Sequence, residues 1–333
     1  MSRRNPTAVV ALLLCATVVV AACSLAYGSR DTAVAEVIGA LRGEGDAEVL
    51  NIVWNLRIPR TLLAFFVGAS LAVAGALAQA WTRNPLADPG FIGVTAGASF
   101  FVAAGTVLGV ASFGLSRVLL ALAGASITAA VVVGISRRSP DPLTLVLVGL
   151  GLSAALQASS TLVGLFSNEA LDALRRWTVG ATFGRGYDDV AIAALGCVIG
   201  MVIAAVGARP LDLLAMGEET SLALGGSPAV ARMCAALGVV VLAGTATAAA
   251  GPTAFVGFAA PHIMRRILGP SLSRSLVPTA LCGGIIVLAA DIVGRLVLQP
   301  GELEMSIVVS ILGAPALIWA VHRGVGWQKE AAL

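Results

Sequence analysis

The chain has 333 residues, of which 58% are hydrophobic and only 12% are charged, and its formal net charge is +3. Soluble domains carry about 25% charged residues. The composition therefore excludes a water-soluble fold and indicates a protein that is embedded in a membrane.

Apolar stretches near the length that crosses a bilayer, about 20 residues, recur along the whole chain. We expect ten spans, at residues 7–27, 60–81, 91–111, 115–136, 142–166, 189–207, 230–250, 252–268, 276–298 and 305–322. The eighth is strongly apolar over only part of its length and suits a short or re-entrant helix. The predicted fold is an all-α polytopic membrane protein with about ten transmembrane helices in a single domain.

The first span follows Arg3 and Arg4 and contains Val-Ala-Ala-Cys23, which is similar to the cleavage site of a lipoprotein signal peptide. Cleavage there would leave nine spans and place the new N-terminus outside. An uncleaved first span fits the long apolar run as well, so processing at Cys23 stays open.

The second span and the loop after it are the most informative stretch of the chain. Arg57 and Arg60 flank Pro59 before a Gly- and Ala-rich span, and a short polar loop with two prolines leads into the third span. Small residues let helices approach closely in lipid, and a loop at membrane depth must be lined by protein because lipid offers no hydrogen bonds. The stretch therefore predicts tightly packed helices in a membrane assembly.

Charged residues give the expected orientation. With the N-terminus in the cytoplasm, twelve of the 21 Lys and Arg residues lie inside, and twelve of the 18 acidic residues lie outside. Because cytoplasmic loops carry an excess of basic residues, we predict that both termini are cytoplasmic.

The segments outside the expected spans are too short for a catalytic domain. The longest have roughly 20 to 30 residues, whereas an autonomous domain needs about 50 or more. A Walker A motif needs a lysine after its glycine-rich loop, and Lys329 is the only lysine of the sequence. The signatures HExxH and GxSxG are also missing. We therefore expect a chain that is not an enzyme.

The segment at 208–229, after the sixth span, contains a short helix-like element with Gly217, Glu218 and Glu219 near its start and glycines at its exit. Glycine after a helix accepts the left-handed backbone that ends it. On this pattern alone, the element is either a solvated loop helix or a rigid lever that inserts into a cytoplasmic partner.

Few ionisable side chains fall within the spans, where each is costly and a functional candidate. Asp291 and Arg295 lie four residues apart on one helix face, which suits a neutralised pair or a docking role. An acidic cluster near mid-membrane, as an ion-coupled carrier would need, is not evident. His262 and His322 are the only histidines, and the five cysteines show no CxxC spacing, so we expect inert thiols and no metal site.

Several motifs together resemble the permease subunits of type II ATP-binding-cassette importers of the FecCD type, which take up iron-siderophores, haem and cobalamin. They run in family order over about 270 residues: RIPRT at 57, GALAQAWTRNPLADPGFIGVTAGA at 75, WTVG at 177, LLAMGEETSLALG at 213, GPTAFVGFAAPHIMRRILGP at 251, ADIVGRLVLQPGELEMSIVVSILGAP at 290 and the Trp319 tail. NPLADPG, the FVG…PH element and the PGELEMSIVVSILGAP end are specific in combination.

The resemblance implies a type II importer permease fold that works with partner chains in the bacterial cytoplasmic (inner) membrane. These partners would be a second permease chain, identical or sister, two ATPase subunits and an extracytoplasmic binding protein. ATP and Mg would bind the ATPase subunits, and this chain would bind no cofactor and no nucleic acid.

The resemblance also implies a docking role for three arginines. Arg57, Arg60 and Arg295 match family arginines at the outer face that accept acidic residues of the binding protein. The guanidinium fork suits this role because it pairs with both oxygens of a carboxylate. Asp291 would then orient Arg295.

Other matching residues imply a pathway and a coupling contact. Asn84 and Leu86 match the loop that narrows the cytoplasmic end of the pathway, and Ser153 and Gln157 in the fifth span are expected to line it. Gly217–Glu219 match the element that contacts the ATPase and transmits its movement.

The expected substrate is a bulky metal chelate that the binding protein delivers. A ferric siderophore is the first choice because it is the commonest substrate in the family, and haem or cobalamin are alternatives. The competing class is an ion-coupled secondary carrier that needs no ATPase.

Overall fold

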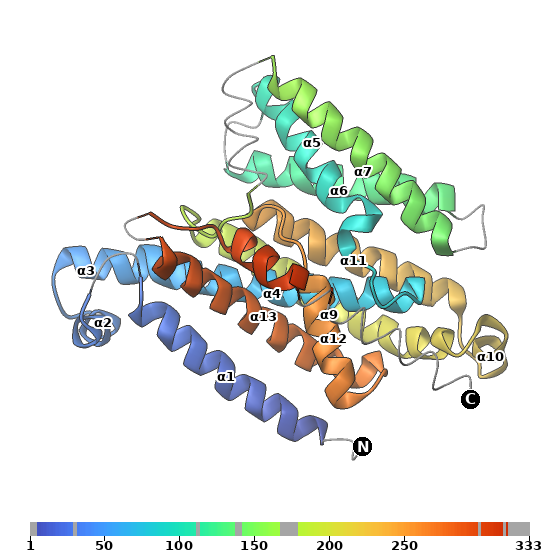
Figure 1. Cartoon of the computed structure of the whole chain (residues 1–333), viewed down its shortest axis with the longest axis horizontal. Helices are drawn as coiled ribbons and strands as arrows, with labels where there is room; N and C mark the ends of the chain where they lie inside the picture. Colours follow the sequence, from blue (N-terminus) through green and yellow to red (C-terminus); the bar gives the residue numbers. More distant parts are fainter. Residues whose placement is uncertain are drawn as a thin grey trace.

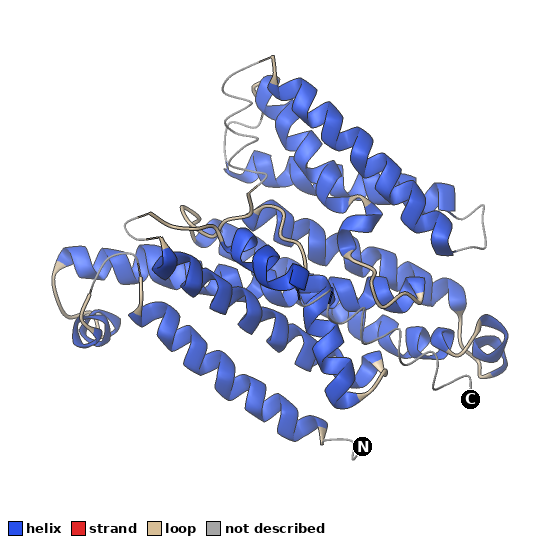
Figure 2. Cartoon of the chain, in the orientation of Figure 1, coloured by secondary structure: helices blue, strands red, loops and turns tan. Residues whose placement is uncertain are grey.

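The computed structural model describes residues 5–28, 32–110, 114–136, 142–166, 179–298, 301–315 and 318. Across these residues, all regular secondary structure is helical, as Figure 2 shows. The all-α prediction is therefore confirmed.

The helices follow one another as labelled in Figure 1. They are α1 (Pro6–Ala26), α2 (Val34–Leu41), α3 (Ala47–Asn51), the π-helix η1 (Ile52–Arg57), α4 (Ile58–Thr82), the 3-10 turn η2 (Pro89–Ile92), α5 (Val94–Val107), α6 (Gly114–Ser136), α7 (Pro142–Gly164), α9 (Tyr187–Ala215), α10 (Glu218–Ala223), α11 (Pro228–Ala250), α12 (Val256–Leu268), α13 (Leu272–Val297) and a last helix at Met305–Pro315.

Within the described residues, seven helices are long and apolar enough to cross a membrane. The expected third, eighth and tenth spans correspond to shorter helices, namely α5 with 14 residues, α12 with 13 residues and Met305–Pro315. Seven long and three shorter helices are consistent with the ten expected spans. Of the tenth span, the part after Pro315 lies outside the described residues except for Ile318.

The helix of the expected sixth span continues past residue 207. α9 runs unbroken to Ala215, so the first part of the predicted 208–229 element belongs to its last turns. Pro210 lies inside this helix, although proline removes a backbone hydrogen bond and usually kinks or ends a helix. The buried side chains of Leu211 and Leu214 hold these turns against the bundle.

α4 is the centre of the bundle. It packs against α9, α11, α12 and α13, and most of its residues are buried. Two glycines permit the close packing: a Cβ atom on Gly68 would overlap the backbone of Gly283 in α13, and one on Gly75 would overlap the backbone of Gly257 in α12. The close helix approach that the Gly- and Ala-rich span predicts is therefore present.

The helices around α4 leave its two ends at opposite faces of the bundle. Figure 1 shows α1 along one edge and the group α5, α6 and α7 along the other, while α4 crosses the middle. Arg60 and Gln79 lie about 28 Å apart along the axis of α4, at 1.5 Å per residue. This separation is close to the thickness of a hydrocarbon core, about 30 Å, so polar groups at both ends lie near the two membrane boundaries.

Candidate functional site

Polar and charged side chains gather at the N-terminal end of α4. They come from α1, α4, α13 and the segments before α9 and after α13, and we call them the arginine cluster: Ser24, Arg60, Thr182, Asp291, Arg295 and Glu302.

Asp291 is the centre of the arginine cluster. Its side chain is fully buried and accepts hydrogen bonds from Nε and Nη2 of Arg60 at 2.9 to 3.1 Å and from the hydroxyl of Thr182 at 2.5 Å. Arg295, one turn later in α13, donates to the same carboxylate through Nε at 2.9 Å and through Nη2. The pair that the four-residue spacing suggested is thus part of a larger network.

The two arginines extend the network to other elements. Nη1 of Arg60 donates to Glu302 at 2.6 Å, and Nη1 of Arg295 donates to the carbonyl oxygen of Ser24 at 2.9 Å. Two positive and two negative charges therefore face one another. Since a buried charge is costly unless it is paired and hydrogen-bonded, the cluster holds α1, α4 and α13 together as one unit.

The three arginines predicted to dock a partner are turned inward in this chain. As whole residues, Arg57 is 5% exposed, Arg60 9% and Arg295 2%. Arg57 donates to the carbonyl oxygens of Leu25 and Ala26 at 2.7 and 3.1 Å, so it caps the C-terminus of α1. A guanidinium group near lipid needs acceptors, and these arginines find them within the chain. To meet a partner, they would have to exchange those acceptors.

A single buried amide lies at the other end of α4. Gln79 is 2% exposed, and its Nε2 donates to the carbonyl oxygens of Ala87 at 3.2 Å and Gly257 at 3.1 Å. Its Oε1 accepts a hydrogen bond from Arg265. We call these four residues the glutamine clamp, because they join α4, the loop at 83–93 and both ends of α12.

Asn84 and Leu86, predicted to narrow the cytoplasmic end of the pathway, lie in the loop at 83–93 that the glutamine clamp holds. We call this loop the gate loop. Asn84 Oδ1 accepts a hydrogen bond from the N–H of Leu86 at 2.9 Å, and Asp88 Oδ1 accepts one from the N–H of Gly90 at 2.8 Å. Side chains that bond the backbone two residues on stabilise turns without a helix or strand. Leu86 is 42% exposed, so the loop presents an apolar side chain at its surface.

Ser153 and Gln157, predicted to line the pathway, have different surroundings on α7. Ser153 Oγ is buried beside Gly93 at the end of η2, and it has no hydrogen-bond partner among the described residues. Gln157, about one turn further along, is exposed on the surface of the single chain. Ser153 therefore faces the end of the gate loop, and Gln157 faces away from the bundle.

Gly217, Glu218 and Glu219 begin α10. Gly217 has a backbone φ of +113°, which residues other than glycine rarely adopt, so this turn requires glycine. Glu218 pairs with Arg232 of α11 at 2.6 Å, and both side chains are about half exposed. Glu219 is exposed. Three large apolar side chains are also exposed around α10: Met216, Leu222 and Leu224.

Asp212 joins the end of α9 to the start of α13. It accepts hydrogen bonds from the N–H groups of Leu272 at 2.7 Å and Ser273 at 3.1 Å, and from the hydroxyls of Ser271 at 2.9 Å and Ser273 at 2.7 Å. The first N–H groups of a helix have no partner inside the helix, and a carboxylate is favourable there. We call these four residues the aspartate clamp.

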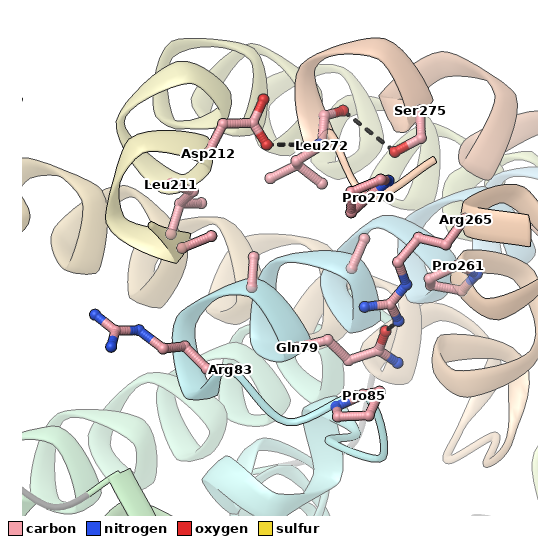
Figure 3. A pocket seen from close by; sticks show the side chains of 13 residues that line it. Gln79, Arg83, Pro85, Leu211, Asp212, Pro261, Arg265, Pro270, Leu272 and Ser275 are labelled. Atoms are coloured by element: carbon pink, nitrogen blue, oxygen red, sulfur yellow. Dashed lines mark hydrogen bonds between the residues drawn. The ribbon is translucent and has the colours of Figure 1, made fainter. Parts of the chain in front are cut away.

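A pocket of about 200 Å³ separates the two clamps (Figure 3). Gln79, Pro85 and Arg265 line it from α4, the gate loop and α12, and Asp212 and Leu272 line it from α9 and α13. Figure 3 shows the residues of α9 and α13 on one side of the pocket and those of α4 on the other.

The described residues contain no group of three His, Cys, Asp or Glu side chains that could hold a metal ion. Cys197, Cys234 and Cys282 are buried among the helices as free thiols. His262 stacks on the ring of Phe258, with 5.5 Å between the ring centroids.

Reasoning from the sequence misses several residues of these networks, among them Gln79, Asp212 and Glu302. Gln79 carries a usable signal, since it is the one side-chain amide in the predicted span at 60–81 and a polar group in a span is a functional candidate. Asp212 and Glu302 carry no such signal, because they lie outside the predicted spans, where acidic residues are common.

The sequence profile of the FecCD transport family matches residues 14–323. The chain is 36% identical over 318 residues to the ferric enterobactin transport system permease protein FepD of Escherichia coli, which covers 93% of this chain and 94% of that protein. It is 38% identical over 303 residues to the Fe(3+)-citrate import system permease protein YfmD of Bacillus subtilis, which covers 90% of each.

The fold is also similar to that of a solved structure. A metal-chelate type ABC transporter in an inward-facing conformation superposes with a TM-score of 0.84 at 26% sequence identity, covering 95% of this chain and 99% of that chain. Sequence and fold therefore agree over nearly the whole length.

Proposed function

The chain belongs to the FecCD transport family, and on this basis we propose that it is the membrane-spanning permease subunit of an ATP-driven importer of ferric chelates. The observation that carries the proposal is the match of nearly the whole chain to permeases for ferric enterobactin and ferric citrate. The likeness to a metal-chelate type ABC transporter supports the same substrate class. A ferric siderophore is the substrate that we propose first.

The surface around α10 fits an ATPase partner. Exposed acidic side chains at Glu218 and Glu219 lie beside exposed apolar side chains, a combination suited to contact with another protein. In this proposal, two ATPase subunits bind ATP and Mg and press on α10. A second permease chain, identical or sister, completes the pathway.

The arginine cluster lies at the end of the helix bundle that, in this proposal, meets an extracytoplasmic binding protein. The contact between Arg60 and Glu302 is its most accessible part, since the two side chains are 11% and 18% exposed. An acidic residue of the binding protein would replace Glu302 on Arg60, and bidentate pairing would favour the exchange. Both termini would then lie in the cytoplasm, and the gate loop with Asn84 and Leu86 would close the cytoplasmic end of the pathway.

Uptake by cells that lack this chain tests the proposed function. We expect the chain, expressed with the proposed partner ATPase, to restore uptake of radiolabelled ferric enterobactin or ferric citrate. Haem and cobalamin serve as alternative probes in the same assay. Depletion of ATP should abolish uptake, while an uncoupler that spares ATP should not. Uptake that persists without the ATPase and collapses with the uncoupler would establish an ion-coupled carrier instead.

A further inference from the structure

We propose that the helix bundle, at its end next to α10, consists of two groups of helices that move as separate bodies, with the pocket between them. Asp212 transmits the displacement of α10 to α13. This inference rests on the proposed function, because it needs an ATPase that moves α10. Asp212 is then a positioning residue for transport and not only a helix cap.

The first body contains the end of α9, α10 and the start of α13. Four hydrogen bonds of the aspartate clamp tie α9 to the first turn of α13. The exit of α10 folds back on α9, since a Cβ atom on Gly226 would lie 2.6 Å from Ser221 Oγ and 3.1 Å from Leu213 Cδ1. A force on α10 therefore reaches Leu272 through a short and well-bonded route.

The second body contains the end of α4, the gate loop and α12. The glutamine clamp holds it together through the carbonyl oxygens of Ala87 and Gly257 and through Arg265. Gly75 adds a backbone contact between α4 and α12 that has no room for a side chain.

The pocket and one glycine allow the two bodies to move relative to each other. Across the pocket, the side chains of the two bodies do not pack directly against each other, so the elements that line it resist displacement less. Gly269 lies between α12 and α13 with a φ of +90°, and a Cβ atom there would meet nothing within 4 Å. The chain thus has an unpacked link where the second body joins the first.

α13 is also fastened near its middle. Gly283 approaches the backbone of Gly68 so closely that a Cβ atom on either would overlap the other helix. From this contact, Leu272 lies about 16 Å away toward the pocket and Asp291 about 12 Å away toward the arginine cluster, at 1.5 Å per residue. A shift of the first turn of α13 about this contact would reach Asp291, so one helix links α10 to the arginine cluster.

Two substitutions test Asp212 in the full complex with the proposed partner ATPase. We expect Asp212→Ala to keep ATPase binding and ATP hydrolysis but to lower uptake of ferric enterobactin or ferric citrate about tenfold, because coupling through a network changes by this order. Asp212→Asn keeps an acceptor for the N–H groups and should recover part of the uptake. The control is Asp188→Asn, an exposed acid at the other end of α9, which should transport normally.

Filling the pocket tests the same inference without breaking a clamp. Ala80→Leu places a larger side chain in the pocket, so we expect uptake to fall while the unfolding temperature stays the same or rises. Ala191→Leu, on an exposed position of α9, is the matched control and should leave both unchanged.

Spin labels measure the two bodies directly in a chain with Cys15→Ser and Cys23→Ser. Labels at the exposed positions Leu222→Cys and Arg274→Cys both lie in the first body, so the distance between them should not change when ATP binds. Labels at Leu222→Cys and Leu86→Cys lie in different bodies, so the distance between them should change. Equal changes in both pairs, or wild-type uptake by Asp212→Ala, would overturn the inference and leave the proposed function intact. Failure of the unmodified chain to support ATP-driven uptake would instead disprove the proposed function.

Discussion

The two ends of α4 bury polar groups in different ways. At the arginine cluster, the buried acid Asp291 accepts hydrogen bonds from two arginines and a threonine. At the other end, Asp88 accepts a hydrogen bond from the backbone of Gly90 and, among the described residues, has no cationic partner. Gln79 holds that end with a neutral amide next to a pocket of about 200 Å³.

The difference indicates at which end of α4 the structure can rearrange. Removing one member of a buried charge network leaves the others without compensation, so the arginine cluster resists change. At Gln79, two of the three hydrogen bonds join neutral groups, and these are exchanged at lower cost. We therefore expect mutations to destabilise the chain most at the arginine cluster and least at Asp88.

The largest effect is expected for Asp291→Asn. The substitution keeps the shape of the side chain but leaves Arg295 without a carboxylate, and breaking a buried pair in this way costs about 3–5 kcal/mol of unfolding free energy. Chemical unfolding of the purified chain in detergent measures it. Asp188→Asn is the exposed control, expected to stay within about 1 kcal/mol. Equal effects of the two variants would show that the cluster does not act as a unit.

A smaller loss is expected for Gln79→Leu. Leucine fills nearly the same volume but leaves the carbonyl oxygens of Ala87 and Gly257 without a donor, which costs about 1–3 kcal/mol for a buried polar group. The same unfolding assay measures it, with Gln157→Leu on the exposed face of α7 as the control. If Gln79→Leu is as stable as that control, the glutamine clamp does not hold the loop.

Asp88→Asn should have the smallest effect, and one of opposite sign. Burial raises the pKa of Asp88, and the hydrogen bond from Gly90 lowers it by less. A carboxyl group whose pKa is higher in the folded than in the unfolded chain reduces stability as the pH rises from the unfolded to the folded pKa. The variant should therefore be more stable than the native chain at pH 7 and equally stable near pH 4.

Unfolding free energies at several pH values between 4 and 8 check this last prediction. Asp188→Asn again serves as the control, since it lies on an exposed turn. Destabilisation by Asp88→Asn at pH 7 would contradict it and would mean that the Asp88 carboxylate is favourably bound in the folded chain.

Local features made much of the fold predictable. The length of each apolar run placed the helices, and the short apolar run before His262 correctly indicated a short helix, α12. The continuation of α9 beyond the predicted span, through Pro210 to Ala215, depends on tertiary packing of Leu211 and Leu214. Local propensity alone could not reveal that packing.

The site was predictable only in part for the same reason. The motifs drew attention to Arg60, Arg295 and the loop after α4, and the four-residue spacing suggested the contact of Asp291 with Arg295. The arginine side chains point inward because they bind acceptors elsewhere in the chain, such as Glu302. No local sequence pattern predicts those acceptors.

By itself, the sequence determined that the chain is a helical membrane protein with about ten apolar helices and which family it belongs to, because hydropathy and motifs are properties of consecutive residues. Only the tertiary structure decided which polar groups meet. Arg60 and Asp291 are 231 residues apart, Gln79 and Gly257 are 178 apart, and Asp212 and Leu272 are 60 apart. Such partners come together because helices pack through small residues in lipid, and that packing sets which buried groups can satisfy one another.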